Sequence, residues 1–358
     1  MKRRDKRLND LLKEASRIRG FPVYRSSFER FISLLRGKRP VDLWDIIRSS
    51  EEHITVIMEI MEEMRLRGLL SIDSAGKIRL TEAGMRFTEP LAPPHPMRRG
   101  DRYGMRLNPP LRSIFEVIKN IYPEITPKDE YDQAPLLPDS AIYKAAYMIN
   151  RGDVASKEVV CVGDDDMISV ILALTGLPRR ITALDIDEGV LSVIERASFR
   201  LKLDIKTYRH DLRNPIPKSL SHKFDTFVTE PPDTVKGITS FVSRGVELLK
   251  EGPGRIGYLG ISPTACPPLG LLKIQEGFTK MGLVITDMLP KFNEYPPVRT
   301  ELKHVEVPEC YEPFYPPPKV WYLSDLVRLK TTRMARPLFR GVVRGGLSDY
   351  KGDARRFI

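Results

Sequence analysis

The stretch EVVCVGDDD, residues 158–166, sets a short apolar run directly before a glycine and three aspartates. The apolar run is typical of a buried strand, and the glycine lets the chain turn sharply and approach a ligand closely. The apolar spacing that follows predicts a helix over 167–175. A strand, a glycine turn and a helix in this order are the opening unit of a parallel α/β sheet.

The same rhythm continues toward the C-terminus. Short apolar runs bounded by turn residues predict further strands at 181–184, 205–208, 224–229, 256–261 and 283–286, with a last strand within 320–329. Helical segments lie between most of them, which indicates a Rossmann-like, methyltransferase-type α/β fold with a mostly parallel sheet. Ligands of such sheets bind outside the carboxyl ends of the strands, so the residues that follow each strand are the candidate site.

The first of these places is the turn Gly163-Asp164-Asp165-Asp166. The fingerprint GxGxxG is absent, and three carboxylates at a helix N-terminus would repel a pyrophosphate, which disfavours NAD or FAD. Three carboxylates favour a cation, such as a sulfonium, an amine or a metal. Helix capping by Asp164 or Asp165 is the simpler alternative, but it accounts for one carboxylate rather than three.

Acidic residues follow the next strands as well. Asp187 is placed to accept the ribose hydroxyls of a nucleoside, or to cap the helix over 189–200. Asp211 follows the third strand, where it could accept from an adenine amine. After the fourth strand, Glu230-Pro231-Pro232-Asp233 forms a rigid turn that aims its side chain at a substrate nitrogen, as in amine-directed transferases of the (D/N)PP(Y/F) type. A proline-stiffened connection without a ligand is the alternative for this turn.

Residues 1–95 contain three helical patterns and a hairpin around the turn 74–76, which predict a winged helix-turn-helix domain. Its third helix is expected to expose an acidic face that would repel DNA phosphates, made of Glu51, Glu52, Glu59, Glu62 and Glu63. This leaves nucleic-acid binding open without favouring it. The rest of the chain divides into a linker at 96–140, a catalytic domain at 141–295 and a Pro/Arg-rich C-terminal segment at 296–358, set off by prolines at 90–96 and 308–318.

The composition limits the class of protein. With 358 residues, 41% apolar, 29% charged and a net charge of +11, the chain is a folded protein of more than one domain. The basic excess lies at both ends, including 36–39, where solvated faces or mobile tails are the plain interpretation. Three separated cysteines argue against a disulfide scaffold or a zinc ribbon. No apolar run is long enough for a membrane span, so we expect a cytoplasmic protein.

From about residue 132 to 295, the sequence resembles the archaeal branched-chain polyamine synthases, also called N4-bis(aminopropyl)spermidine synthases. The resemblance rests on a series of short motifs in one order. The matching stretches are Tyr131-Asp132-Gln133, Arg151-Gly152-Asp153, Val162-Gly163-Asp164-Asp165-Asp166, Ser169-Val170, Gly176-Leu177-Pro178, Leu184-Asp185-Ile186-Asp187-Glu188, Asp211-Leu212-Arg213, His222-Lys223-Phe224-Asp225-Thr226-Phe227, Gly257-Tyr258 and Phe292-Asn293-Glu294-Tyr295.

The resemblance implies an aminopropyltransferase. Decarboxylated S-adenosylmethionine would be the co-substrate, and spermidine or a related polyamine the acceptor. The products would be N4-aminopropylspermidine, N4-bis(aminopropyl)spermidine and methylthioadenosine. It also implies a homodimer without a prosthetic group or metal. The proposed base maps to Asp164. The remaining expected roles are catalytic for Asp166 and Glu230, nucleoside-binding for Gly163, Asp165, Asp187 and Asp211, and substrate-binding for Asp164, Glu230, Asp233 and Tyr295.

The chemistry of the residues agrees with this implication. Spermidine is almost fully protonated at neutral pH, so the site must take a proton before the nitrogen can attack, and a carboxylate cluster can do so. One departure is visible. Family members commonly have Asp-Pro-Pro-Glu where this chain has Glu230 and Asp233 exchanged, which bears on acceptor choice or rate. The proline-rich tail also diverges, and it could close over the substrate.

Two alternatives remain open at this stage. One is an S-adenosylmethionine-dependent N-methyltransferase acting on nucleic acid or protein, with the basic ends of the chain holding the polymer. The other is a regulator that binds a nucleoside without catalysis. Donor choice separates the first alternative from the aminopropyltransferase, because a carboxylate-rich pocket should reject a donor that carries a carboxylate.

Overall fold

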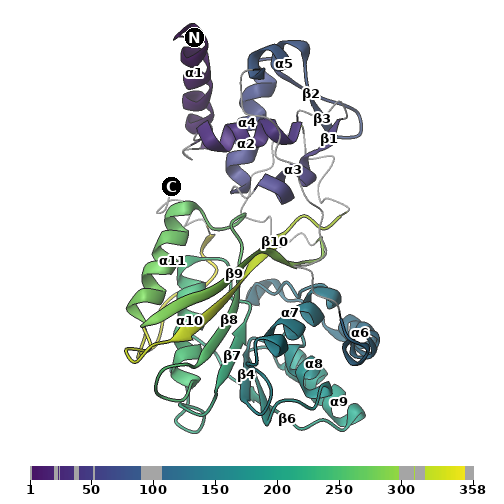
Figure 1. Ribbon diagram of the computed structural model, residues 1–358, viewed down its shortest axis with the longest axis vertical. Coiled ribbons are helices and arrows are strands. Elements are labelled where there is room, and N and C mark those ends of the chain that lie inside the picture. Colours follow the sequence, from purple (N-terminus) through teal and green to yellow (C-terminus); the bar gives the residue numbers. More distant parts are fainter. Residues whose placement is uncertain are drawn as a thin grey trace.

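The computed structural model describes residues 2–19, 23, 25–35, 40–50, 53–89, 107–297, 310 and 319–350. A small helical part stands at one end of a larger α/β part (Figure 1). Several sequence features lie outside the described residues. These are the prolines at 90–96 and 308–318, the basic run 36–39, and the pair Glu51 and Glu52.

The N-terminal part is built from helices and a small antiparallel sheet. Its elements are α1 (Lys2–Arg19), α2 (Arg25–Leu35), β1 (Val41–Asp42), α3 (Leu43–Ser50), α4 (Ile54–Leu66), β2 (Leu70–Ile72), β3 (Lys77–Leu80) and α5 (Glu82–Thr88). The strand order is β1-β3-β2. The three helices and the hairpin agree with the expected elements, whereas the winged-helix assignment stays a prediction. The basic start of the chain forms helix α1 rather than a tail, because it buries Leu8, Leu11 and Ala15.

The acidic face expected on the third helix is wrong for two of its members. Glu59 is 1% exposed and Glu63 is 8% exposed, while Glu62 pairs with Arg65 at 2.7 Å. The physical reason is packing, because α1, α2 and α3 all contact α4 and leave little of it to solvent. Helix α4 therefore presents no open face for a DNA groove.

The segment 107–140, expected to be a linker, is ordered structure packed on the larger part. It contains α6 (Pro109–Ile121), two 3-10 turns at Tyr122–Glu124 and Asp129–Tyr131, and the start of α7 (Pro138–Asn150). Helix α6 begins at Pro109 behind the cap Asn108, and it buries Leu111, Ile114 and Ile118 on one face. Three apolar residues at helical spacing drive this docking. The proline and arginine content of the segment makes this apolar pattern hard to recognise in the sequence.

The larger part is a seven-stranded sheet with strand order β6-β5-β4-β7-β8-β10-β9. The strands β4 (Glu158–Val162), β5 (Arg180–Asp185), β6 (Ile205–Arg209), β7 (Thr226–Thr229) and β8 (Ile256–Ile261) are parallel to their neighbours in this group. The predicted positions of these strands and the mostly parallel α/β class are confirmed. The central strands carry continuous apolar runs because helices cover both of their faces.

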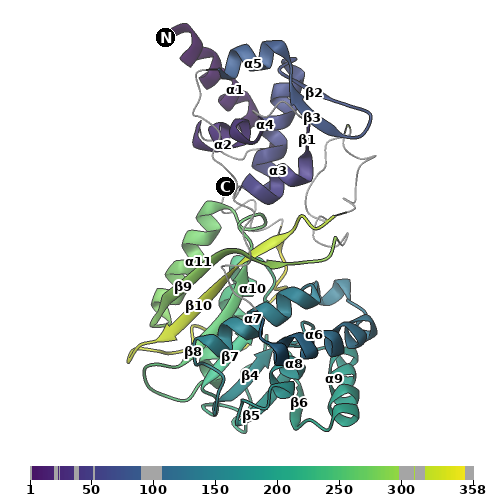
Figure 2. The same ribbon diagram turned by 45° about the vertical axis from the view of Figure 1, so that its right-hand side comes forward.

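Two helical layers make two cores. Helices α7, α8 (Ile168–Leu174) and α9 (Glu188–Leu201) pack on one face, and α10 (Val235–Leu248) and α11 (Pro268–Lys280) on the other. Figure 2 shows the two layers on either side of the sheet. None of the helices in the described ranges has both the length and the apolar character that a membrane crossing requires.

At the C-terminal edge of the sheet, the last strand expected within 320–329 is confirmed, whereas the strand before it is longer than expected. Strand β9 runs over Leu283–Glu294 rather than four residues, and β10 (Leu323–Thr331) lies between β8 and β9, antiparallel to both. The sheet therefore continues past residue 295, where the catalytic domain was expected to end. This pairing brings Tyr295 beside Tyr322, with a hydrogen bond of 3.3 Å from the Tyr295 N–H to the Tyr322 carbonyl.

Candidate active site

A cavity of about 610 Å³ opens at the carboxyl ends of the parallel strands. Its wall contains residues that follow β4, β5, β6, β7 and β8, as the Rossmann-like topology requires. The predicted site residues that line it are Gly163, Asp165, Asp211, Glu230, Asp233 and Tyr295. Asp164, Asp166 and Asp187 are not part of the lining.

The Gly163 turn separates three aspartates into three environments. Gly163 has a φ of 71°, which favours glycine, and its N–H donates to the Leu184 carbonyl at 2.7 Å. The Asp164 carboxylate accepts the Ser169 N–H at 3.2 Å. The Asp166 carboxylate accepts the Leu136 N–H at 2.7 Å, away from the cavity. Asp165 is the aspartate that the turn presents to the cavity.

Burial gives this turn a high proton affinity. Loss of water raises the pKa of Asp164 to about 7, against the hydrogen bond from Ser169. It raises the pKa of Asp166 to about 7 as well, although the charge of Lys144 opposes the change. Burial and the neighbouring carboxylates raise the pKa of Asp165 well above its ordinary value. Carboxyl groups in this state can exchange protons near neutral pH, as a general base must.

Lys144 is a buried cation that the sequence argument missed. It lies on α7 at 0% side-chain exposure, contacts the Glu230 carboxylate directly, and stands 3.8 Å from Asp166. Burial works to lower the pKa of Lys144, but the charges of Glu230 and Asp166 outweigh it and raise this pKa. The available signal was a lysine flanked by apolar residues within the helix 138–150.

Glu230 is held from several sides. Besides Lys144, its carboxylate accepts hydrogen bonds from the Tyr295 hydroxyl at 2.5 Å and the Asn293 amide at 3.2 Å. A Cβ atom on Gly260 would lie 2.0 Å from Glu230 Oε2. The missing side chain at 260 thus makes room for the glutamate, which is one methylene longer than the aspartate common at this position in the family it resembles.

The acid at the other end of this turn, Asp233, has its own partners. Its carboxylate accepts the Ser262 N–H at 2.9 Å and the Tyr322 hydroxyl at 2.5 Å. Burial raises the pKa of Asp233 to about 7, against the Tyr322 hydrogen bond. Glu230 and Asp233 therefore face the cavity as two carboxylates, each anchored by one tyrosine.

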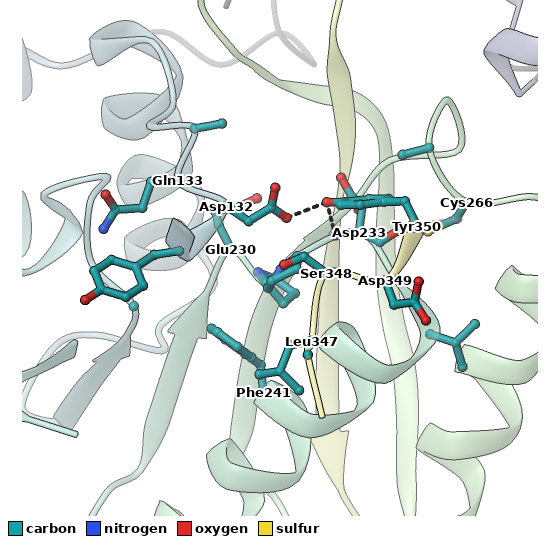
Figure 3. A pocket seen from close by; sticks show the side chains of 18 of the residues that line it. Asp132, Gln133, Glu230, Asp233, Phe241, Cys266, Leu347, Ser348, Asp349 and Tyr350 are labelled. Atoms are coloured by element: carbon teal, nitrogen blue, oxygen red, sulfur yellow. Dashed lines mark hydrogen bonds between the residues drawn. The ribbon is translucent and has the colours of Figure 1, made fainter. Parts of the chain in front are cut away.

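Residues 341–350, which we call the C-terminal strap, cross the cavity mouth. Thr234 Oγ1 donates to the Leu347 carbonyl at 2.5 Å, and the buried Arg244 guanidinium donates to the Gly341 carbonyl at 2.6 Å. The Tyr350 hydroxyl donates to Asp132 at 2.6 Å and accepts the Asp233 N–H at 3.2 Å (Figure 3). The part of the tail described here thus forms a wall of the cavity.

Asp187, which was expected to bind the nucleoside, does not line the cavity. Asp187 caps α9 through the Gly189 N–H at 2.7 Å, and its carboxylate also accepts from Lys128 at 2.5 Å and Gln133 at 3.2 Å. Burial opposes ionisation, but these hydrogen bonds together lower the pKa of Asp187. Asp185, at the end of β5, lines the cavity in its place. Asp187 therefore has the capping role that was its alternative interpretation, and its role toward a nucleoside stays a prediction.

Asp211 follows β6 and does line the cavity. Its carboxylate is paired with Arg213, whose Nη2 lies 2.7 Å away, and the hydrogen bonds from Arg213 lower the pKa of Asp211. The adenine-facing position expected for Asp211 is therefore geometrically available, with Arg213 as its fixed partner. The described residues include no group of three or more His, Cys, Asp or Glu side chains arranged to hold a metal ion.

The N-terminal part also contributes to the wall. His53, Ile54 and Thr55, at the start of α4, line the cavity, and the Ile54 N–H donates to the Thr264 carbonyl at 3.2 Å. Burial lowers the pKa of His53 to about 4, so this imidazole is neutral and adds no positive charge to the carboxylate cavity. The start of helix α4 thus forms one side of the cavity.

The raised carboxyl pKa values predict a pH-dependent stability. A carboxyl group whose folded-state pKa is raised to about 7 stabilises the fold below its ordinary pKa near 4, and this contribution is lost as the pH rises through 7. We expect the free energy of unfolding of the unliganded protein, measured by urea denaturation, to fall between pH 5 and 8. Asp233→Asn should reduce this fall by about 2 kcal/mol. Asp204→Asn, at an exposed position, is the matched control. If the free energy of unfolding falls equally steeply with pH in both variants, the assignment is contradicted.

Comparison with known proteins gives a consistent result. A family model described as the branched-chain polyamine synthase A C-terminal domain matches residues 111–344. The chain is 33% identical over 322 residues to the N(4)-bis(aminopropyl)spermidine synthase of Thermococcus kodakarensis, covering 87% of this chain and 89% of the relative. It is 33% identical over 346 residues to the enzyme of the same name from Thermus thermophilus, covering 96% and 97%.

A solved structure is similar over nearly the whole chain. It is the branched-chain polyamine synthase from Thermus thermophilus, in complex with N4-aminopropylspermidine and 5'-methylthioadenosine. The match has a TM-score of 0.80 and 30% sequence identity, and it covers 97% of this chain and 98% of the other.

Proposed function

Because this chain belongs to the branched-chain polyamine synthase family, we propose that it transfers aminopropyl groups from decarboxylated S-adenosylmethionine to the secondary amine of spermidine. The products are N4-aminopropylspermidine and N4-bis(aminopropyl)spermidine, and methylthioadenosine leaves. The observation that carries this proposal is a single cavity that joins strand-end residues suited to a nucleoside with a set of buried carboxylates suited to a polyamine.

The donor would bind at the ends of β5 and β6. Asp185 and Asp211 line the cavity there, together with the main chain at Gly163. Asp185 would accept a ribose hydroxyl, and Asp211 would face the adenine. Asp187 would act indirectly, by fixing Gln133 and Lys128 beside the nucleoside. Among the described residues that line this part of the cavity, Arg213 is the only arginine or lysine, and it is already paired with Asp211. A donor without a carboxylate therefore suits this part of the cavity.

The acceptor amine must lose a proton before it attacks, and Asp165 is the carboxylate of the Gly163 turn that can reach it. Asp164 and Asp166 do not line the cavity, and their carboxyl groups can exchange protons near neutral pH. Glu230 is committed to Lys144 and Tyr295, so we assign it to positioning rather than to proton transfer. The carbon–nitrogen bond then forms as the carbon–sulfur bond breaks, and the sulfur keeps the bonding electrons.

The ammonium ends of the polyamine would meet the other carboxylates of the cavity. Asp132, Asp233, Glu130 and Asp349 line its wall. Separate carboxylates along one cavity match a chain of separated cations better than a single charge. The N-terminal part, which we propose is a winged helix in architecture, supplies His53 to the same wall. The homodimer remains a prediction.

Product analysis tests the proposed function. The protein is incubated with spermidine and either decarboxylated S-adenosylmethionine or S-adenosylmethionine, and the polyamines are separated by mass. We expect tertiary and quaternary aminopropyl products with the decarboxylated donor only, because the cavity is lined by carboxylates that repel a donor carboxylate. Tight binding of S-adenosylmethionine by calorimetry, together with no product from spermidine, would refute the assignment.

A further inference from the structure

Two tyrosine rings meet at the acidic turn Glu230–Asp233. The ring centroids of Tyr295 and Tyr322 lie 5.3 Å apart, with the ring planes inclined by 65°. Both residues line the cavity. We call this pair the aromatic corner. Trp321 stands next to it, with its ring centroid 5.3 Å from that of Tyr322.

The aromatic corner is fixed on several sides. The Tyr295 hydroxyl donates to Glu230, and the Tyr322 hydroxyl donates to Asp233. The Tyr295 N–H also donates to the Tyr322 carbonyl, just beyond the paired ends of β9 and β10. Trp321 is in turn packed against Trp44 of the N-terminal part, at 5.1 Å between ring centroids. A ring held in this way can contact a ligand with little further loss of conformational freedom.

The chemistry of two successive transfers explains what such rings could do. In the first transfer, the secondary amine forms a carbon–nitrogen bond, the donor carbon–sulfur bond breaks, and the nitrogen gives its proton to a carboxylate. In the second transfer, the tertiary amine attacks another donor molecule and becomes a quaternary ammonium with four carbon substituents. That nitrogen has no N–H left, so no carboxylate can hold it by a hydrogen bond. Aromatic faces attract such a cation through their quadrupole.

We propose that the aromatic corner, Tyr295 with Tyr322, stabilises the quaternary nitrogen as it forms and thereby determines how far the reaction proceeds from the tertiary to the quaternary product. This inference rests on the proposed function. Glu230 and Asp233 supply the negative field in both transfers, whereas the ring faces matter most in the second, where hydrogen bonding is lost.

The first test distinguishes the contribution of the Tyr322 ring from that of its hydroxyl group. In Tyr322→Leu, the ratio of the second-transfer rate constant to the first should fall by roughly 3- to 30-fold. Tyr322→Phe keeps the ring, and it should keep this ratio within about 2-fold of the original. Tyr131→Leu is the matched control, because Tyr131 lines the cavity beside Lys128 at the donor end. It should slow both transfers without changing their ratio. An unchanged ratio in Tyr322→Leu overturns the inference.

The second test uses the unaltered protein and so does not depend on how a variant folds. Tetramethylammonium and trimethylammonium are compared as inhibitors of the first transfer. An aromatic corner predicts that tetramethylammonium, which has no N–H, inhibits at a concentration at least about 3-fold lower. A site governed by carboxylate hydrogen bonds alone predicts the reverse order, and that result or an equal potency refutes the role of the rings.

The two levels of proposal fail in different ways. If the unaltered protein forms no tertiary amine from spermidine and the decarboxylated donor, the proposed function is wrong and the inference falls with it. If the tertiary amine forms but removal of the ring leaves the ratio of the two rate constants unchanged, or tetramethylammonium is not the stronger inhibitor, the proposed function stands. Only the role of the aromatic corner is then refuted.

Discussion

Replacement of Lys144 by methionine is expected to lower the free energy of unfolding by about 3–5 kcal/mol, because it leaves Glu230 as a buried carboxylate without its counter-ion. The side chain of Lys144 is fully buried, so water cannot replace the lost ammonium. Asp166 stands on the other side of the same ammonium and would also lose a neighbouring positive charge. Urea denaturation at pH 8 measures this loss.

A double substitution identifies the cause of that loss. Lys144→Met combined with Glu230→Gln removes both charges, and it should recover most of the stability, since a buried ion pair replaced as a whole is often neutral in cost. Lys119→Met provides the control on the exposed face of α6, where the pair with Glu116 should contribute less than about 1 kcal/mol. If the double variant is no more stable than Lys144→Met alone, packing rather than charge explains the effect.

The sequence was informative where the pattern is local. Apolar runs and turn residues predicted the five parallel strands, and the rule that ligands bind at strand ends led to the turns after β4 and β7. The resemblance to a known family then indicated which reaction to expect. These steps succeed because periodicity and turn chemistry are properties of neighbouring residues.

The sequence was less informative where a residue acts across the fold. Lys144 contacts Glu230 from 86 positions away, and Tyr322 reaches Asp233 from 89 positions away. No spacing rule connects such pairs. The first joins helix α7 to the turn after β7, and the second depends on the place of β10 between β8 and β9. The acidic face of α4 failed for a related reason. Helical periodicity could not tell that α1 would cover the side on which Glu59 and Glu63 lie.

The choice among the three aspartates of the Gly163 turn is also beyond a sequence argument. A run of three identical residues has no internal signal for which carboxylate faces a ligand. The turn geometry makes the distinction, because Gly163 at a φ of 71° directs the next residue toward the Ser169 N–H and the following one toward the cavity. The catalytic role implied for Asp164 is therefore tested against that of Asp165.

Asp165→Asn is expected to lower kcat by 10²- to 10⁴-fold, because the amide keeps the shape of the side chain but cannot accept the proton of the attacking amine. Asp164→Asn is its matched control: the same change one residue earlier, on a side chain that faces Ser169 rather than the cavity, should leave most of kcat. Donor binding by calorimetry should change little in either variant, since Asp185 lies at the nucleoside end.

Measuring kcat across pH adds a readout that a structural defect would not give. The residual activity of Asp165→Asn should lose the rise with increasing pH that a titrating base produces, whereas Asp164→Asn should keep it. If Asp164→Asn is the variant that loses turnover while Asp165→Asn retains it, the base is Asp164, and the carboxylate on the cavity wall serves only to attract the polyamine.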